Sequence, residues 1–116
     1  MGHVRHHAIV VTGTRDMPKR APFNLEEKRN EILQLVGDKL VVTEIYDSPS
    51  NMHATFFVCP DGSKQWWPAS NHGDKLRGRI ISLLEGTGLS WAEVQYGDDD
   101  RQDYLLSSSG RPRRES

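Results

Sequence analysis

The chain of 116 residues is long enough for one domain, and a domain of this size needs no disulfides or metal ions to hold its core together. Because 15 Lys and Arg residues stand against 16 Asp and Glu residues, the net charge of -1 gives no general attraction to nucleic acid or to an anionic membrane. The single cysteine, Cys59, excludes an internal disulfide and a zinc site built from several cysteines, and it fits a reducing compartment.

Neither a membrane span nor a signal peptide is predicted. No apolar run approaches the roughly 18 residues of a membrane span, and the opening MGHVRHH lacks the apolar stretch of a signal peptide. We therefore expect a cytoplasmic protein that has no membrane partner.

The first predicted element is a central strand at 4–12, VRHHAIVVT, which ends in a run of β-branched residues typical of a strand buried on both faces. Residues 13–23 carry glycine, prolines and mixed charges without a period, so they form a connection. A helix follows, capped by Asn24 and ended by Gly37. Its predicted apolar stripe comprises Leu25, Ile32, Leu33 and Val36.

Two strands at 40–47 and 52–59 are joined by the turn-forming SPSN segment at 48–51, which predicts a hairpin. A second helix begins at a cap provided by Ser70 or Asn71 and ends at Gly86 or Gly88. Its predicted apolar stripe comprises Leu76, Ile80, Leu83 and Leu84.

The last predicted strand, at 91–97, alternates two sets of side chains and is half-buried. The predicted core set is Ala92, Val94 and Tyr96, and the opposite set is Trp91, Glu93 and Gln95. Residues 98–116 are rich in charge and serine, and we expect most of this segment to be a disordered tail behind a single domain at 1–97.

The element order β-α-β-β-α-β predicts an α+β fold of the ferredoxin-like type. Its four-stranded antiparallel sheet would have the spatial order 4-1-3-2 and carry both helices on one face. An α+β sheet with another strand order is the alternative.

No catalytic residue, cofactor or metal site is predicted. His6 and His7 are neighbours on a strand and point to opposite faces, and at strand rise His3 and His7 lie about 13 Å apart, too far to share an ion. Cys59 has only Lys64 nearby in sequence to activate its thiol, so we interpret it as a small buried hydrophobe. The glycines of GTGLS lack the spacing of a phosphate-binding loop.

Two adjacent tryptophans, Trp66 and Trp67, lie on a polar connection. Adjacent side chains of an extended segment point in opposite directions, so we expect one ring to pack against the domain and the other to meet a partner. Trp91 is the third predicted anchor, because aromatic rings dominate many interfaces. Packing of both connection rings inside the domain is the alternative.

The sheet face without helices is a second candidate surface. On the strand at 52–59 it would carry either His53, Thr55 and Phe57 or Met52, Ala54 and Phe56, and the sequence does not decide between these sets. Such a face binds another molecule or pairs with its own copy in a dimer.

Basic residues suggest nucleic-acid binding as the alternative function. Lys75, Arg77 and Arg79 on the second helix form a possible basic patch, with the arginines of the tail beside it. Base stacking on the sheet is disfavoured, because the strand at 52–59 lacks the basic and aromatic pattern of such RNA-binding domains.

Three stretches, RHHAIVVT, CPDGSKQWWPAS with the following GDKLR, and WAEVQYGDD, resemble small proteins of unassigned function encoded by actinobacterial phages. The resemblance covers about a third of the chain, includes no motif of known chemistry and assigns no role to a residue. It implies an accessory protein that acts in the host cytoplasm by occupying a protein surface.

These observations favour an interaction protein that binds a host protein or its own copy and performs no catalysis. The nucleic-acid module is the alternative, and a small ligand-binding or enzymatic dimer with a cleft between helices and sheet is the third.

Overall fold

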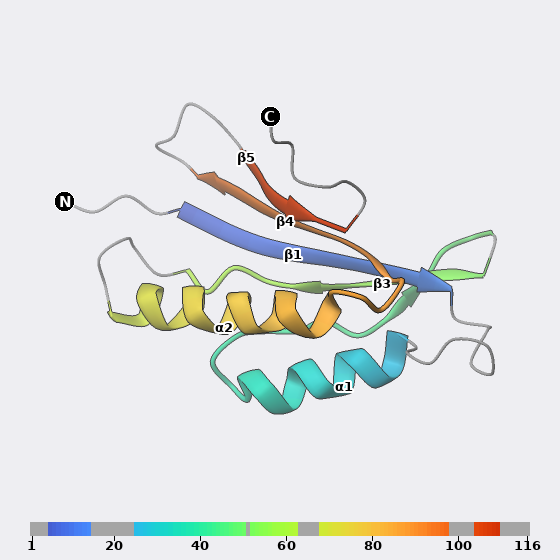
Figure 1. Ribbon diagram of the computed structural model, residues 1–116, viewed down its shortest axis with the longest axis horizontal. Coiled ribbons are helices and arrows are strands. Elements are labelled where there is room, and N and C mark those ends of the chain that lie inside the picture. Colours follow the sequence, from blue (N-terminus) through green and yellow to red (C-terminus); the bar gives the residue numbers. More distant parts are fainter. Residues whose placement is uncertain (1–4, 15–24, 51, 63–67, 98–103, 110–116) are drawn as a thin grey trace.

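The computed structural model describes residues 5–14, 25–50, 52–62, 68–97 and 104–109 (Figure 1). The elements in chain order are β1 (Arg5–Thr14), α1 (Leu25–Val36), β2 (Tyr46–Asp47), β3 (His53–Val58), α2 (Pro68–Leu84), β4 (Ser90–Gly97) and β5 (Tyr104–Ser108). No helix among these described ranges is long and apolar enough to cross a membrane.

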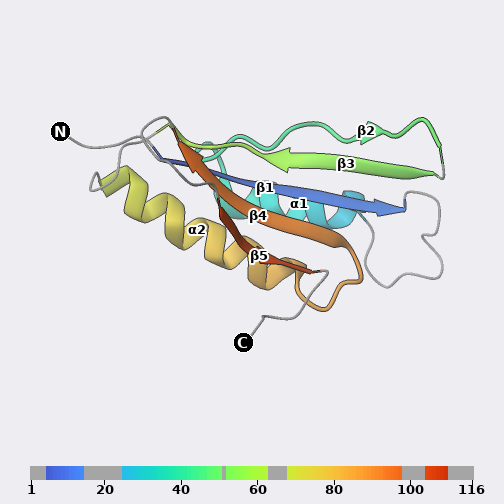
Figure 2. The ribbon, with the colours of Figure 1, turned by 90° about the horizontal axis from the view of Figure 1, so that it is seen from above.

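The five strands form one antiparallel sheet in the order β2-β3-β1-β4-β5, with β1 in the middle. The predicted α+β class is confirmed, and the four predicted strands lie in the predicted order. The predicted number of strands was wrong, because Tyr104–Ser108, in the expected tail, pairs with the outer edge of β4. Both helices lie on the same side of the sheet, where they pack against each other (Figures 1 and 2).

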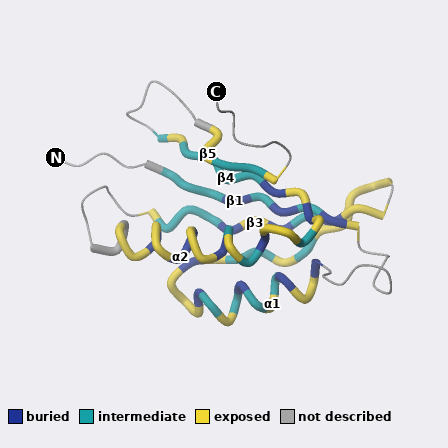
Figure 3. The backbone as a smooth tube through the Cα atoms, viewed as in Figure 1, coloured by how far each residue is buried: buried dark blue, intermediate teal, exposed yellow. Residues whose placement is uncertain are grey.

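The core lies between the helices and one face of the sheet, as the alternation along β1 and β3 shows (Figure 3). Ile9 pairs with Val58 and Val11 with Phe56 across the two central strands, and all four side chains are fully buried. Val10, between them on the opposite face, is only half-buried. The prediction that β1 is buried on both faces was therefore wrong.

Both helices follow their apolar stripes. In α1 the buried positions include Leu25, Ile32 and Val36, and Gly37 ends the helix with a φ of 56°, which favours glycine. Leu33 is only half-buried. Helix α2 starts earlier than predicted, at Pro68, because proline suits the first turn of a helix. It buries Leu76, Ile80 and Leu84, and Gly86 follows with a φ of 78°.

The strand expected at 40–47 is reduced to Tyr46–Asp47 and an isolated bridge between Val42 and Val58. The reason lies at Thr43. Its backbone carbonyl accepts a hydrogen bond from Arg29 Nε at 2.7 Å, while the N–H of Phe57 donates to the Thr43 hydroxyl at 2.9 Å. A side chain therefore replaces the regular backbone acceptor, and the ladder is interrupted.

The faces of β4 are the reverse of those expected. Trp91 pairs with Val11 and Glu93 with Ile9, which places the tryptophan and its alternate neighbours on the helix side of the sheet. Ala92 and Val94 therefore lie on the opposite face. The faces were predicted wrongly because the apolar residues Ala92 and Val94 lie on the side of the sheet that neither α1 nor α2 covers.

Candidate functional site: the open face of the sheet

The side of the sheet that faces away from the helices carries mainly uncharged side chains from all five strands. The cross-strand register places Phe57, Val10 and Ala92 in one row across β3, β1 and β4. We call this surface the open face; its members include His6, Ala8, Val10, Thr12, Tyr46, Thr55, Phe57, Ala92, Val94, Tyr96 and Leu105.

The open face has small side chains in its middle and large ones toward its edges. Ala8, Val10 and Val94, in the middle, are half-buried by their neighbours. Phe57, on β3, is 45% exposed, and on the edge strands β2 and β5 Tyr46 is 63% exposed and Leu105 is 60% exposed. Large apolar side chains left this open on one contiguous surface are typical of an interaction site.

Some polar side chains of the open face contact one another across the strands. The hydroxyls of Thr12 and Thr55 are 2.8 Å apart, and the rings of His6 and Tyr96 lie with centroids 5.1 Å apart. None of the open-face residues defined above is Asp, Glu, Lys or Arg. The surface therefore suits an uncharged, largely apolar partner, because it offers no charged group to attract or orient an ionic one.

Between the two sets that the sequence left open for β3, the register selects the one with His53, Thr55 and Phe57 for the open face. Ala54 and Phe56 are fully buried beneath the sheet. The phenylalanine that the sequence could not assign thus becomes the main exposed aromatic residue of β3.

The predicted tryptophan anchors have different outcomes. Trp91 is only 7% exposed and belongs to the core, so its prediction as a partner-binding anchor was wrong. The physical reason is its pairing with Val11, which turns the ring toward the helices. Trp66 and Trp67 lie outside the described residues.

The predicted basic patch on α2 is broken by the burial of Arg77, which is 3% exposed. Its guanidinium donates to Asp74 Oδ1 at 2.7 Å and to Asp61 Oδ2 at 3.5 Å. Lys75 and Arg79 are exposed. The arginine therefore holds α2 to the segment after β3, and the prediction that all three cations share a surface was wrong.

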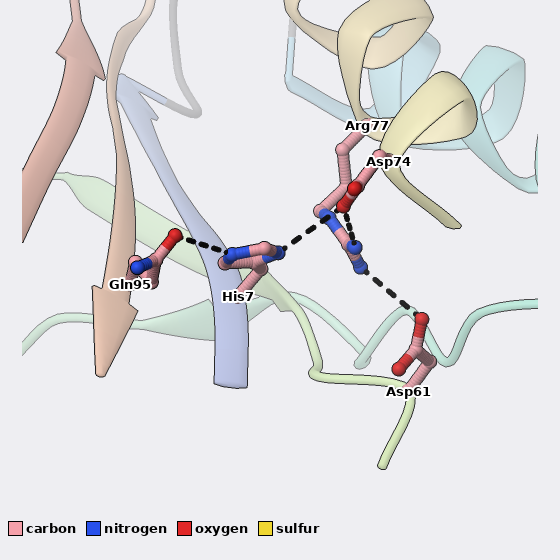
Figure 4. Close-up of polar contacts among 5 residues, drawn as sticks. All are labelled: His7, Asp61, Asp74, Arg77 and Gln95. Atoms are coloured by element: carbon pink, nitrogen blue, oxygen red, sulfur yellow. Dashed lines mark hydrogen bonds and ion pairs between the residues drawn. The ribbon is translucent and has the colours of Figure 1, made fainter. Parts of the chain in front are cut away.

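His7 extends this polar cluster to the sheet (Figure 4). Its Nδ1 lies 3.3 Å from Asp74 Oδ1, and its Nε2 forms a hydrogen bond of 2.7 Å with Gln95 Oε1. Both ring nitrogens of His7 thus contact other side chains of the fold, and the histidine links β1 to α2 and to β4. Within the described part of the chain, no group of three or more metal-ligating side chains could hold an ion.

A groove between α1 and α2 is lined by Leu35, Leu83, Arg79 and Glu31, among others. It lies on the helix pair, and none of its lining residues is a histidine or cysteine. Cys59, directly after β3, is half-buried. Its backbone N–H donates a hydrogen bond to the backbone carbonyl of Val41. Among the described residues, neither feature supplies a nucleophile with a base beside it, and Lys64 lies outside them.

Sequence reasoning missed the part of the open face contributed by β5. The apolar pair Leu105 and Leu106 inside a polar segment was the available signal, but two residues are too few to establish a period. Leu105 pairs with Val94 across β4 and extends the apolar surface to the fifth strand.

Comparison of the chain with protein-family models, curated proteins and solved structures found no match. The function proposed below therefore rests on the residues and on their geometry.

Proposed function

We propose that this protein acts by binding a protein surface through the open face and performs no catalysis. The observation that supports the proposal is the contiguous uncharged surface around Phe57, Val10 and Ala92, with large apolar side chains left partly exposed at its edges. Leaving such side chains in water costs about 25 cal/mol for each Å² of apolar area, and a partner that covers them removes this cost.

We place the fold in the ferredoxin-like group, with β5 added to the edge of its four-stranded sheet. The order β4-β1-β3-β2 and the shared side of the two helices support this placement. The short sequence stretches that resemble phage proteins lead us to propose an accessory role in a host cytoplasm. The nucleic-acid alternative is weakened, because Arg77 is buried in ion pairs with Asp61 and Asp74.

Site-specific photocrosslinking tests the proposal. A benzoylphenylalanine placed at Phe57 keeps an aromatic side chain on the open face, and the same group placed at Gln34, exposed on α1, is the matched control. In the native host cell we expect discrete protein adducts from position 57 that position 34 does not give. Equal adduct patterns from the two positions would contradict the proposal.

A further inference from the structure

We propose that the partner of the open face is a second copy of this chain, packed sheet against sheet about a two-fold axis that runs parallel to β1. This inference rests on the proposed function, because it names the partner for that same surface. Three properties of the open face lead to it: its lack of charge, its distribution of large and small side chains, and its size.

The absence of charge fits self-association. In a two-fold interface each residue near the axis meets its own copy or a close neighbour of it, so a charged residue there would face a like charge. Val10 lies on the middle strand of the five, closest to the proposed axis, and is apolar. A partner of opposite charge would need charged groups to recognise, and the open-face residues defined above provide none.

The sheet also has a shape that can pair with its own copy. A two-fold axis along β1 exchanges β3 with β4 and β2 with β5, because the order β2-β3-β1-β4-β5 has equal numbers of strands on each side of β1. Phe57 of one copy then lies over Ala92 of the other, since both belong to the same row. A large ring thus meets a small side chain twice in the interface, and Val10 meets Val10.

The size of the surface suits a small dimer interface. The five strands, which are two to ten residues long and about 4.8 Å apart, cover on the order of 500 Å² before the relief of the side chains is counted. A standard interface buries about 800 Å² of accessible surface on each partner. Sheets that pack face to face with their strands nearly aligned interdigitate their side chains over such areas.

Sedimentation equilibrium of the purified full chain tests the dimer. We expect self-association with a dissociation constant in the micromolar range or tighter. Phe57→Lys and Ala92→Glu should each weaken it at least about tenfold, because each places an unpaired charge in an apolar interface. Gln34→Lys, on the exposed side of α1, should leave it unchanged. Circular dichroism verifies that each variant is folded.

A mixture of the two variants tests the geometry. Phe57→Lys in one copy and Ala92→Glu in the other face each other in the proposed dimer, so an equimolar mixture should associate at least about tenfold more tightly than either variant alone. If Ala92→Glu does not fold, a second experiment replaces it. Val10→Cys in a Cys59→Ser chain should then be linked to its own copy by a short bis-maleimide, and Gln34→Cys in the same chain should not.

A wild-type chain that stays monomeric at about 100 µM would overturn the dimer, as would a dimer that both charged variants leave intact. If the wild-type chain dimerises but the mixture of variants associates no more tightly than either variant alone, the proposed axis is wrong. Where the Val10→Cys experiment replaces the mixture, a dimer that the bis-maleimide does not link has the same meaning. If the wild-type chain is monomeric and crosslinking at position 57 captures a different protein, only this inference fails. If position 57 gives no more adducts than position 34 and the chain is monomeric, the proposed function fails as well.

Discussion

Arg77 of α2 donates a hydrogen bond of 3.5 Å to Asp61, in the segment that follows β3. The Arg77 side chain is 3% exposed and the Asp61 side chain is 14% exposed. The same guanidinium is bound to Asp74, one turn earlier on its own helix. Because the two carboxylates come from different segments, the arginine ties the middle of the helix to the segment that follows β3. An ion pair with so little exposure is sensitive to the loss of one partner.

Arg77→Met should therefore lower the free energy of unfolding by about 2–4 kcal/mol, because it removes the cation from two carboxylates, one of them mostly buried. Urea denaturation measures the change. Lys75→Met, at an exposed position on the same helix, is the control and should change stability by less than about 0.5 kcal/mol. Equal effects of the two variants would show that the Arg77 contacts do not hold the helix.

Two glycines of α2 provide a matched pair. A Cβ at Gly73 would collide with Asp61 Oδ2 and lie 3.2 Å from the Arg77 guanidinium, whereas a Cβ at Gly78 meets nothing within 4 Å. Gly78→Ala should stabilise the protein by up to about 1 kcal/mol through helix propensity. Gly73→Ala should be less stable than Gly78→Ala by about 2 kcal/mol, because the Asp61 carboxylate must move away from Arg77. Thermal unfolding compares the two, and the same gain at both sites would argue against the tight contact.

Trp91 should behave as a core residue. Trp91→Ala is expected to cost about 3–5 kcal/mol of stability, because it leaves a cavity where the ring packs. In a Trp66→Phe, Trp67→Phe chain, Trp91 is the only indole, and its fluorescence should be blue-shifted and poorly quenched by acrylamide. Red-shifted, readily quenched emission from the folded chain would show that the Trp91 indole is exposed and can contact a partner.

Adjacent phenylalanines on β3 test the two faces of the sheet. Phe56→Ala should cost about 3–5 kcal/mol, because the ring is fully buried. Phe57→Ala should cost less than about 1.5 kcal/mol in dilute solution, because its ring is already partly exposed. Denaturation at low protein concentration avoids a contribution from self-association. Equal losses at the two positions would mean that the open face is covered within the monomer.

The sequence predicted the helices and the order of the elements because these follow from local patterns. The stripe through Leu25, Ile32 and Val36 and the glycine after it define α1 whatever lies opposite. Likewise, the alternation at 91–97 identified a strand, which the structure has at Ser90–Gly97. A hydrophobic period depends on residues a few positions apart, so it can be recognised in the sequence alone.

The candidate site depended on contacts between distant residues, so only the tertiary structure decided it. The pairing of Val11 with Trp91 turned the predicted anchor into the core, and the same register turned Ala92 and Val94 outward. The burial of Arg77 required Asp61, 16 positions earlier, and the fifth strand required an edge of β4 to pair with. An alternation of side chains along the sequence indicates that a strand has two faces. Which face meets the helices is set by the pairing register and by where the helices end.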